Sequence, residues 1–283
     1  MKADIIHEAE LKLGEGPVWV DGAFHCVDIE NKRLHRFGDD ATASQTWDSV
    51  GRLGAAVPTV DGRFVLCEED GLAVLDLGSG ERTELTRHLP DENLRHNDCK
   101  ADPQGRLWLG TMSFDGEPTA ALSRRGVDGQ IVEQVGGVTI GNGLAWRVTG
   151  EGSRGGLFYY IDTPTKRVDA FDYNPALGTI TGRRPLWEAD DGDGSPDGMT
   201  IDAEGNLWVA FWGGSCVRCL SPAGKVIETV HVPTPQVTSC CFGGDDLKTL
   251  YITTASFEGP KEAGSVFACR PGVAGLPVDR VKP

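Results

Sequence analysis

Four short motifs place an oxygen-bearing side chain beside a glycine or at a turn. Glu15 lies in the segment GEGP, Asn97 in RHND, Asn142 in GNG and Asp197 in SPDG. Two carboxylates and two carboxamide oxygens form an all-oxygen set, which suits a hard divalent cation such as Ca²⁺, Mg²⁺ or Mn²⁺. If these side chains meet in space, the chemistry that they predict is metal binding.

The spacing of these residues indicates that they do meet. When the turns of the chain are aligned, one position recurs before each turn, at intervals of 39, 43, 45, 55 and 41 residues. Such an interval is the length of one four-stranded propeller blade. Equivalent positions on the innermost strands of a propeller lie at one height around its central channel. The six positions are Glu15, Gly54, Asn97, Asn142, Asp197 and Thr238.

Internal repeats support the same architecture. The segment ADPQGRLWLGT from Ala101 matches IDAEGNLWVAF from Ile201, and weaker copies begin at Val20, Val60 and Gly243. Each copy is typical of a turn that feeds a strand, and no helical periodicity is sustained. We therefore expect an all-β fold: one six-bladed β-propeller domain over residues 1–283, with four-stranded antiparallel blades around a central channel.

Composition narrows the class of protein. The 27 basic and 42 acidic residues give a formal charge of −15, which disfavours binding to nucleic acid or to an anionic membrane. The chain has no secretory apolar segment at its start and no run long enough to cross a membrane, so we expect a cytoplasmic protein.

The eight cysteines do not indicate disulfides in a long chain without an export signal, and Cys216 and Cys219 are expected to be ordinary buried thiols. Cys216 and Cys219 form a single C-x-x-C in a predicted strand, where the two side chains face opposite ways, and no further zinc ligands lie nearby. Cys240 and Cys241 are adjacent, which places one on each face of a strand.

Each candidate ligand also has a purely structural interpretation. Glu15, Asn142 and Asp197 occupy turn-forming sequences, and Asn97 could cap a solvated loop. The shared register favours the ligand interpretation over these alternatives. His96 could act as a base, but adjacent residues usually face apart, so neither His96 nor Asp98 is assigned a role.

Taken together, several segments resemble the senescence marker protein/gluconolactonase family, which includes regucalcin and luciferin-regenerating enzyme. The resemblance spans essentially the whole chain, in the family's order. The segments are LGEGPVW, RHNDCKADPQGRLWLGTM, IGNGLAW, SPDGMTIDAEGNLWVAFWGG and CFGGDDLKTLYITTAS.

The resemblance implies a six-bladed propeller with a single divalent metal and hydrolysis of sugar lactones. The family's metal ligands fall on Glu15, Asn142 and Asp197, and its substrate-contacting residues fall on Arg95 and Asn97. The chain departs from the family at 147–157, where a longer glycine-rich loop replaces a short turn.

The hypothesis from sequence is hydrolysis of an aldonolactone to the free acid, with Asp197 accepting the proton of the attacking water. Arg95, Asn97 and Met112 would bind the substrate. The cofactor is one divalent ion, and Ca²⁺, Zn²⁺, Mg²⁺, Mn²⁺ and Fe²⁺ stay open. The only partner expected is the small sugar lactone, with a monomer or weak homo-oligomer. Two alternatives remain: a hydrolase of organophosphates or non-sugar lactones, and a calcium-binding propeller without activity.

Overall fold

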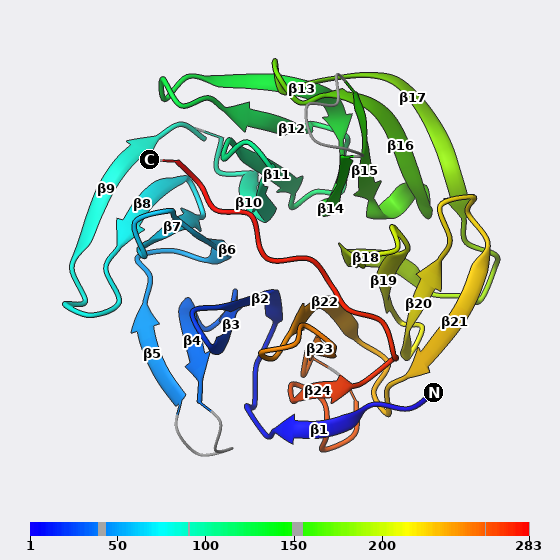
Figure 1. The fold of residues 1–283 in the computed structure, drawn as a ribbon. Coiled ribbons are helices and arrows are strands. Elements are labelled where there is room, and N and C mark those ends of the chain that lie inside the picture. Colours follow the sequence, from blue (N-terminus) through cyan, green and yellow to red (C-terminus); the bar gives the residue numbers. More distant parts are fainter. Residues whose placement is uncertain (39–43, 90, 149–154, 258, 283) are drawn as a thin grey trace.

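The chain forms a ring of six four-stranded antiparallel sheets around a central channel (Figure 1). This computed structural model describes residues 1–38, 44–89, 91–148, 155–257 and 259–282. The regular structure of those residues consists of strands and one short 3-10 helix, η1 (Thr163–Thr165). The predicted six-bladed β-propeller is therefore confirmed. Most of the predicted loop 147–157 lies outside the described residues.

The strands follow one another from the channel outward in the first five blades. Blade 1 has β2 (Gly14–Val20), β3 (Ala23–Asp28), β4 (Arg33–Phe37) and β5 (Ser44–Asp48). Blade 2 has β6 (Leu53–Pro58), β7 (Phe64–Glu68), β8 (Gly71–Leu75) and β9 (Arg82–Arg87). Blade 3 has β10 (Leu94–Ala101), β11 (Leu107–Ser113), β12 (Ala120–Arg125) and β13 (Ile131–Val138). Blade 4 has β14 (Gly141–Val148), β15 (Gly156–Asp162), β16 (Arg167–Asn174) and β17 (Thr179–Glu188). Blade 5 has β18 (Ser195–Ile201), β19 (Leu207–Trp212), β20 (Cys216–Leu220) and β21 (Val226–His231).

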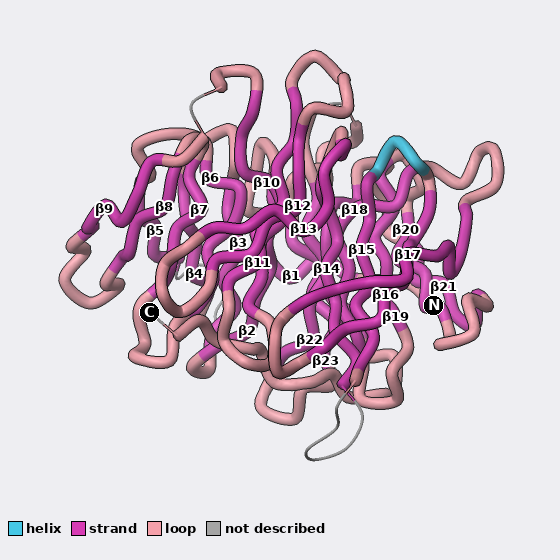
Figure 2. The backbone as a smooth tube through the Cα atoms, turned by 90° about the horizontal axis from the view of Figure 1, so that it is seen from above, coloured by secondary structure: helices cyan, strands magenta, loops and turns pink. Residues whose placement is uncertain are grey.

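Blade 6 closes the ring with strands from both ends of the chain. It contains β22 (Val237–Gly243), β23 (Thr249–Thr254) and β24 (Val266–Cys269), and its outermost strand is β1 (Asp4–His7). Strand β1 pairs with β24 through Asp4 opposite Ala268 and Ile5 opposite Phe267. Strand β1 precedes blade 1 in the chain but pairs within blade 6. Its hydrogen bonds with β24 therefore close the ring between the two ends of the chain. Figure 2 views the ring from its edge, with loops on both faces.

The repeated Asp-x-x-Gly-x-Leu-Trp segments have one local cause. The carboxylate of Asp102 accepts hydrogen bonds from the backbone nitrogens of Gln104 and Arg106 and from Nε1 of Trp108, the last at 3.1 Å. Asp202 repeats the pattern, with Trp208 Nε1 at 2.9 Å. The aspartate thus closes the turn and anchors the core tryptophan that follows it, as expected for a structural residue.

The hydrophobic core lies between blades. The described residues form six buried apolar clusters, and each contains side chains from two neighbouring blades. Cys216 and Cys219 belong to different clusters, and so do Cys240 and Cys241. The two side chains of each pair therefore lie on opposite faces of their strand, as predicted. All the cysteines are free thiols. No helix in the described part of the chain is long and apolar enough to span a membrane.

The C-terminal segment forms a strap across one end of the channel (Figure 1). On one side, Gly275 N donates to Leu247 O and Ala203 N donates to Ala274 O. On the other, Val281 N donates to Pro58 O. Residues 276–280 run between these anchors, over a cavity of about 470 Å³ inside the channel. The strap therefore covers one end of the channel; the sequence repeats gave no sign of it.

Candidate metal centre

Each innermost strand breaks its pairing register at the predicted column position. The breaks lie between Glu15 and Val18, Leu53 and Ala55, His96 and Cys99, Gly141 and Leu144, Pro196 and Met199, and Val237 and Ser239. Such β-bulges leave a residue unpaired and re-aim its side chain. In five blades the column residue lies inside this break, whereas Glu15 still pairs with Val27 at its edge.

A chain of hydrogen bonds joins the column residues of blades 3 and 4. Arg95 Nη1 donates to Asn97 Oδ1 at 2.7 Å, and Asn97 Nδ2 donates to Asn142 Oδ1 at 2.9 Å. Asn97 Nδ2 also donates to Gly141 O at 2.9 Å. The structure therefore brings together Arg95, Asn97 and Asn142, although 45 residues separate the two asparagines.

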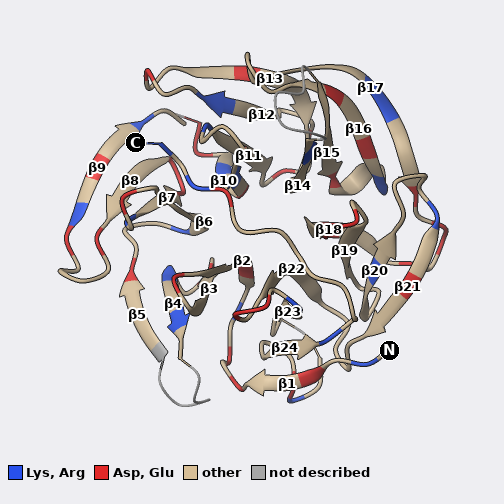
Figure 3. Ribbon diagram, in the orientation of Figure 1, with Lys and Arg blue, Asp and Glu red and all other residues tan. Residues whose placement is uncertain are grey.

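Glu15 and Asp197 lie close enough to these residues to perturb one another's ionisation. Both are buried, at 8% and 6% exposure. Burial, followed by repulsion from Asp98, raises the pKa of Glu15 to about 8. Burial, followed by repulsion from Glu15 and Asp98, raises the pKa of Asp197 well above its usual range. Arg95 opposes both effects but does not cancel them. Strands β2 and β18, which carry these two residues, border the channel (Figure 3).

Asp98 joins this group, although the sequence left its role open. It is 5% exposed, burial raises its pKa, and its Oδ2 atom has no hydrogen-bond partner. It occupies the same bulge of β10 as Asn97 and lines the cavity beneath the strap. Its position after Asn97 was the only available signal, and that signal could not say which way the side chain points.

The two remaining column positions supply no ligand. A Cβ atom on Gly54 would lie 2.6 Å from His96 O and 2.7 Å from Asn97 O, so the third blade's backbone fills that space. Thr238 donates its hydroxyl hydrogen bond at 2.5 Å to Gly14 O and lies 2.9 Å from Thr253 Oγ1. The four column positions with predicted ligand side chains therefore lie on blades 1, 3, 4 and 5.

Arg95 and Met112 lie side by side as a pair across β10 and β11. Arg95 is 4% exposed, and burial lowers its pKa to about 10, so the guanidinium remains charged. Its Nη1 also donates to His96 O at 2.8 Å, while Nε has no partner. Met112 is half-buried next to it. The Nη1 atom of Arg95 is therefore bonded within the protein, whereas its buried Nε is not.

His96 faces away from the candidate ligands. Its Nδ1 lies 2.6 Å from Glu68 O, a contact in which the ring nitrogen donates, and its Nε2 lies 3.2 Å from His88 Nε2. Burial lowers the pKa of His96 to about 3, so the ring is neutral at physiological pH. This side chain is part of the packing between blades 2 and 3.

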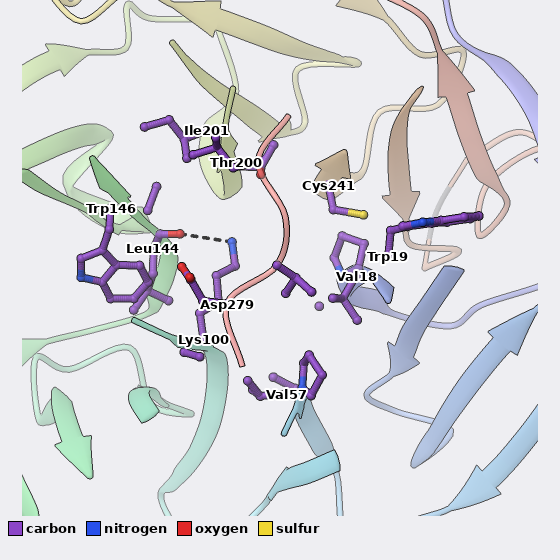
Figure 4. A pocket seen from close by; sticks show the side chains of 18 of the residues that line it. Val18, Trp19, Val57, Lys100, Leu144, Trp146, Thr200, Ile201, Cys241 and Asp279 are labelled. Atoms are coloured by element: carbon purple, nitrogen blue, oxygen red, sulfur yellow. Dashed lines mark hydrogen bonds between the residues drawn. The ribbon is translucent and has the colours of Figure 1, made fainter. Parts of the chain in front are cut away.

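Asp98 is one of the residues that line the cavity under the strap, which Figure 4 shows from close by. Its wall is mostly apolar, with Val18, Val57 and Leu144 among the lining side chains. Lys100 Nζ donates to Leu144 O at 3.2 Å and to Met199 O at 2.5 Å. The ammonium group is therefore held by backbone carbonyls of blades 4 and 5. Its positive charge partly opposes the rise in the pKa of Glu15 and of Asp98.

The residues present fit a hard cation. Glu15 and Asp197 are buried together with raised pKa values, and Asp98 offers an unpartnered oxygen. This is the signature of a site with a deficit of positive charge. Among the described residues, no three His, Cys, Asp or Glu side chains gather as a metal-holding group. A cation here would therefore take part of its coordination from an amide oxygen, such as Oδ1 of Asn142.

Comparison with known proteins places this chain in a family. The model of the SMP-30/Gluconolactonase/LRE-like region matches residues 13–256, most of the sequence. The chain belongs to this family. It is similar to the protein named "Putative sugar lactone lactonase YvrE" of Bacillus subtilis, with 39% identity over 89% of this chain and 87% of the relative. It is also similar to the pentonolactonase XacC of Haloferax volcanii, with 35% identity over 91% of this chain and 86% of the relative.

Among solved structures, luciferin-regenerating enzyme has the same fold. The two chains share 32% identity with a TM-score of 0.89, and the match covers 97% of each. The resemblance seen in the sequence is thereby confirmed, and with it the membership of a family that includes lactonases.

Proposed function

We propose that this protein hydrolyses a sugar lactone, such as glucono-, xylono- or arabinolactone, to the free aldonic acid with one divalent metal ion. The proposal assigns Glu15, Asn142 and Asp197 as the metal ligands. The observation that supports it is that the buried carboxylates of Glu15 and Asp197 lie close enough for Glu15 to raise the pKa of Asp197, while Asn97 holds the amide oxygen of Asn142 by a hydrogen bond. The names of two similar proteins, a sugar lactone lactonase and a pentonolactonase, favour a lactone as substrate.

A divalent cation, when bound, supplies Lewis-acid polarisation of the lactone carbonyl and eases deprotonation of water. Asp197 accepts a proton from the water that attacks the carbonyl carbon. The ring carbon–oxygen bond then breaks, and the proton passes to the departing ring oxygen. The product is a hydroxy acid that ionises, so each turnover releases one proton near neutral pH.

Arg95 and Asn97 orient the substrate in this proposal. Arg95 is a donor-only group with an unpartnered Nε, and it is held by Asn97 Oδ1 and His96 O. Such a fixed guanidinium can bind sugar hydroxyls without ordering cost at the moment of reaction. Met112 packs next to it and contributes an apolar contact to the face of the substrate.

The test is acid release from a panel of aldonolactones by metal-stripped protein, with each divalent ion added back in turn. Asp197→Asn removes the proton acceptor with little change in shape. Asp193→Asn is the matched control, because Asp193 lies four residues earlier and pairs with Arg218 outside the column. We expect one or more ions to restore hydrolysis in the wild type and the control but not in Asp197→Asn.

Two outcomes would overturn the proposal. Hydrolysis of a phosphotriester but of no aldonolactone would assign the site to organophosphates. Tight metal binding without hydrolysis of any lactone would indicate a metal-binding propeller without this activity. Hydrolysis that persists unchanged in Asp197→Asn would remove that residue from the mechanism.

A further inference from the structure

A threonine outside the column connects two of the proposed ligands. Thr163 follows strand β15 as the first residue of η1, and its backbone nitrogen donates to Ile140 O at 3.1 Å. Its hydroxyl oxygen lies 2.8 Å from Asn142 Nδ2 and 2.9 Å from Pro196 O. No sequence motif distinguishes this residue, because a polar side chain after a strand is common.

The direction of each hydrogen bond around Thr163 is determined. Pro196 O can only accept, so the single hydroxyl proton of Thr163 goes to that carbonyl. The hydroxyl oxygen must then accept from Asn142, which turns the amide nitrogen of Asn142 toward Thr163. On the other side, Asn97 Nδ2 donates to Asn142 Oδ1. The amide is therefore held from both sides, with its oxygen on the side of Asn97.

The same hydroxyl reaches the strand of a second ligand. Pro196 immediately precedes Asp197 at the bulge of β18, where the backbone leaves its regular pairing with β19. Proline has no backbone N–H, so the carbonyl of Pro196 is its only backbone group that can form a hydrogen bond. Thr163 donates a hydrogen bond to this carbonyl and accepts one from Asn142. It therefore connects β14 and β18, the strands of neighbouring blades that carry two of the proposed ligands.

We propose that Thr163 is a positioning residue for the metal centre, which orients the Asn142 amide oxygen and fixes the backbone beside Asp197. This inference rests on the proposed function, since it takes Asn142 and Asp197 as ligands. Partners that orient metal ligands from outside the coordination sphere typically change metal affinity by about 10–100-fold when removed.

The test compares the metal affinity of three variants by calorimetric titration of metal-stripped protein. Thr163→Val keeps the shape but loses both hydrogen bonds, whereas Thr163→Ser keeps the hydroxyl. Thr165→Val is the matched control, because Thr165 lies in the same 3-10 helix and its hydroxyl donates only to Asp162 O. We expect a loss of about 10–100-fold in Thr163→Val, near wild-type affinity in Thr163→Ser, and no change in Thr165→Val.

A double-mutant comparison separates positioning from a general loss of structure. Terbium ions are a suitable probe, since a hard cation of higher charge keeps binding measurable in weakened variants. In an Asn142→Ala background, adding Thr163→Val should cost far less affinity than it does in the wild type, because the amide to be oriented is gone. Equal losses in both backgrounds would overturn the inference, as would wild-type affinity in Thr163→Val.

The experiment distinguishes failure of the proposed function from failure of this inference. If the wild-type protein binds no divalent cation, both are wrong. A wild-type protein that binds metal as tightly as Thr163→Val does would overturn only the role of Thr163.

Discussion

Asn97 Nδ2 lies 2.9 Å from Asn142 Oδ1 and donates a hydrogen bond to it across the junction between blades 3 and 4. The contact runs from a proposed substrate-binding residue to a proposed metal ligand. It means that the two functions share one hydrogen-bonded unit, which starts at the Arg95 guanidinium. A substitution of Asn97 should therefore change the affinity for the metal as well as for the substrate.

The substitution Asn97→Asp tests this coupling. An ionised carboxylate at this position cannot donate, so its oxygens would face Asn142 Oδ1 and Gly141 O, which are also acceptors. We expect the Asn142 amide to turn and metal affinity to fall by about tenfold or more. Calorimetric titration measures it, and an unchanged dissociation constant would show that Asn97 does not support the ligand.

The close contact at Gly54 gives a second prediction. Because an added Cβ would meet backbone oxygens of His96 and Asn97 at 2.6 and 2.7 Å, Gly54→Ala must displace the strand that carries Asn97. We expect a loss of about 1–3 kcal/mol in the free energy of unfolding. Urea denaturation measures it against Gly78→Ala, where the nearest atom is a side-chain oxygen at 3.3 Å. Equal stability of both variants would contradict this packing.

Much of this architecture could be predicted from the sequence, and the reason is the repeat. One residue per blade recurs in register, so Glu15, Asn97, Asn142 and Asp197 could be aligned without knowing any contact. The β-bulges at or directly after these positions follow the same register. The ligand roles themselves remain proposals.

Features outside the repeat could not be predicted. Thr163 acts through contacts from blade 4 to blade 5, which no periodic pattern encodes. The direction of the Asp98 side chain depends on the local shape of one bulge. The strap around Val278 and the closing strand β1 belong to the chain ends, where no copy of the repeat exists for comparison.

The strap should contribute to stability through its one deeply buried side chain. Val281 is 1% exposed and packs with Ala101 and Leu107 between blades 2 and 3, whereas Leu276 on the same strap is 48% exposed. We expect Val281→Ala to lower the free energy of unfolding by about 1–3 kcal/mol. Leu276→Ala should have little effect. Denaturant titration distinguishes them, and equal small effects would show that the strap is loosely held.

The strap also predicts a dependence of stability on pH. Burial, followed by repulsion from Asp102, raises the pKa of Asp279 to about 7. In the unfolded chain the pKa of an aspartate is about 4. The folded state therefore binds more protons between these values, so the contribution of Asp279 to stability is lost as pH rises from about 4 to about 7.

Asp279→Asn should remove this contribution, because an amide does not ionise. Thermal unfolding of both proteins across this range gives the difference directly. We expect the variant to gain melting temperature relative to the wild type as pH rises, with the two proteins closest near pH 4. Parallel curves over the whole range would show that Asp279 titrates normally in the folded protein.

The central claim is that one divalent ion sits between Glu15, Asn142 and Asp197. The most direct measurement is anomalous diffraction from crystals of metal-stripped protein soaked in Mn²⁺, with Asp197→Asn crystals treated alike. The account predicts a single strong peak within about 2.0–2.6 Å of oxygens from these three side chains, lost or much weaker in the variant. A peak elsewhere, such as at the acidic turn around Asp191, or none in the channel, would contradict it.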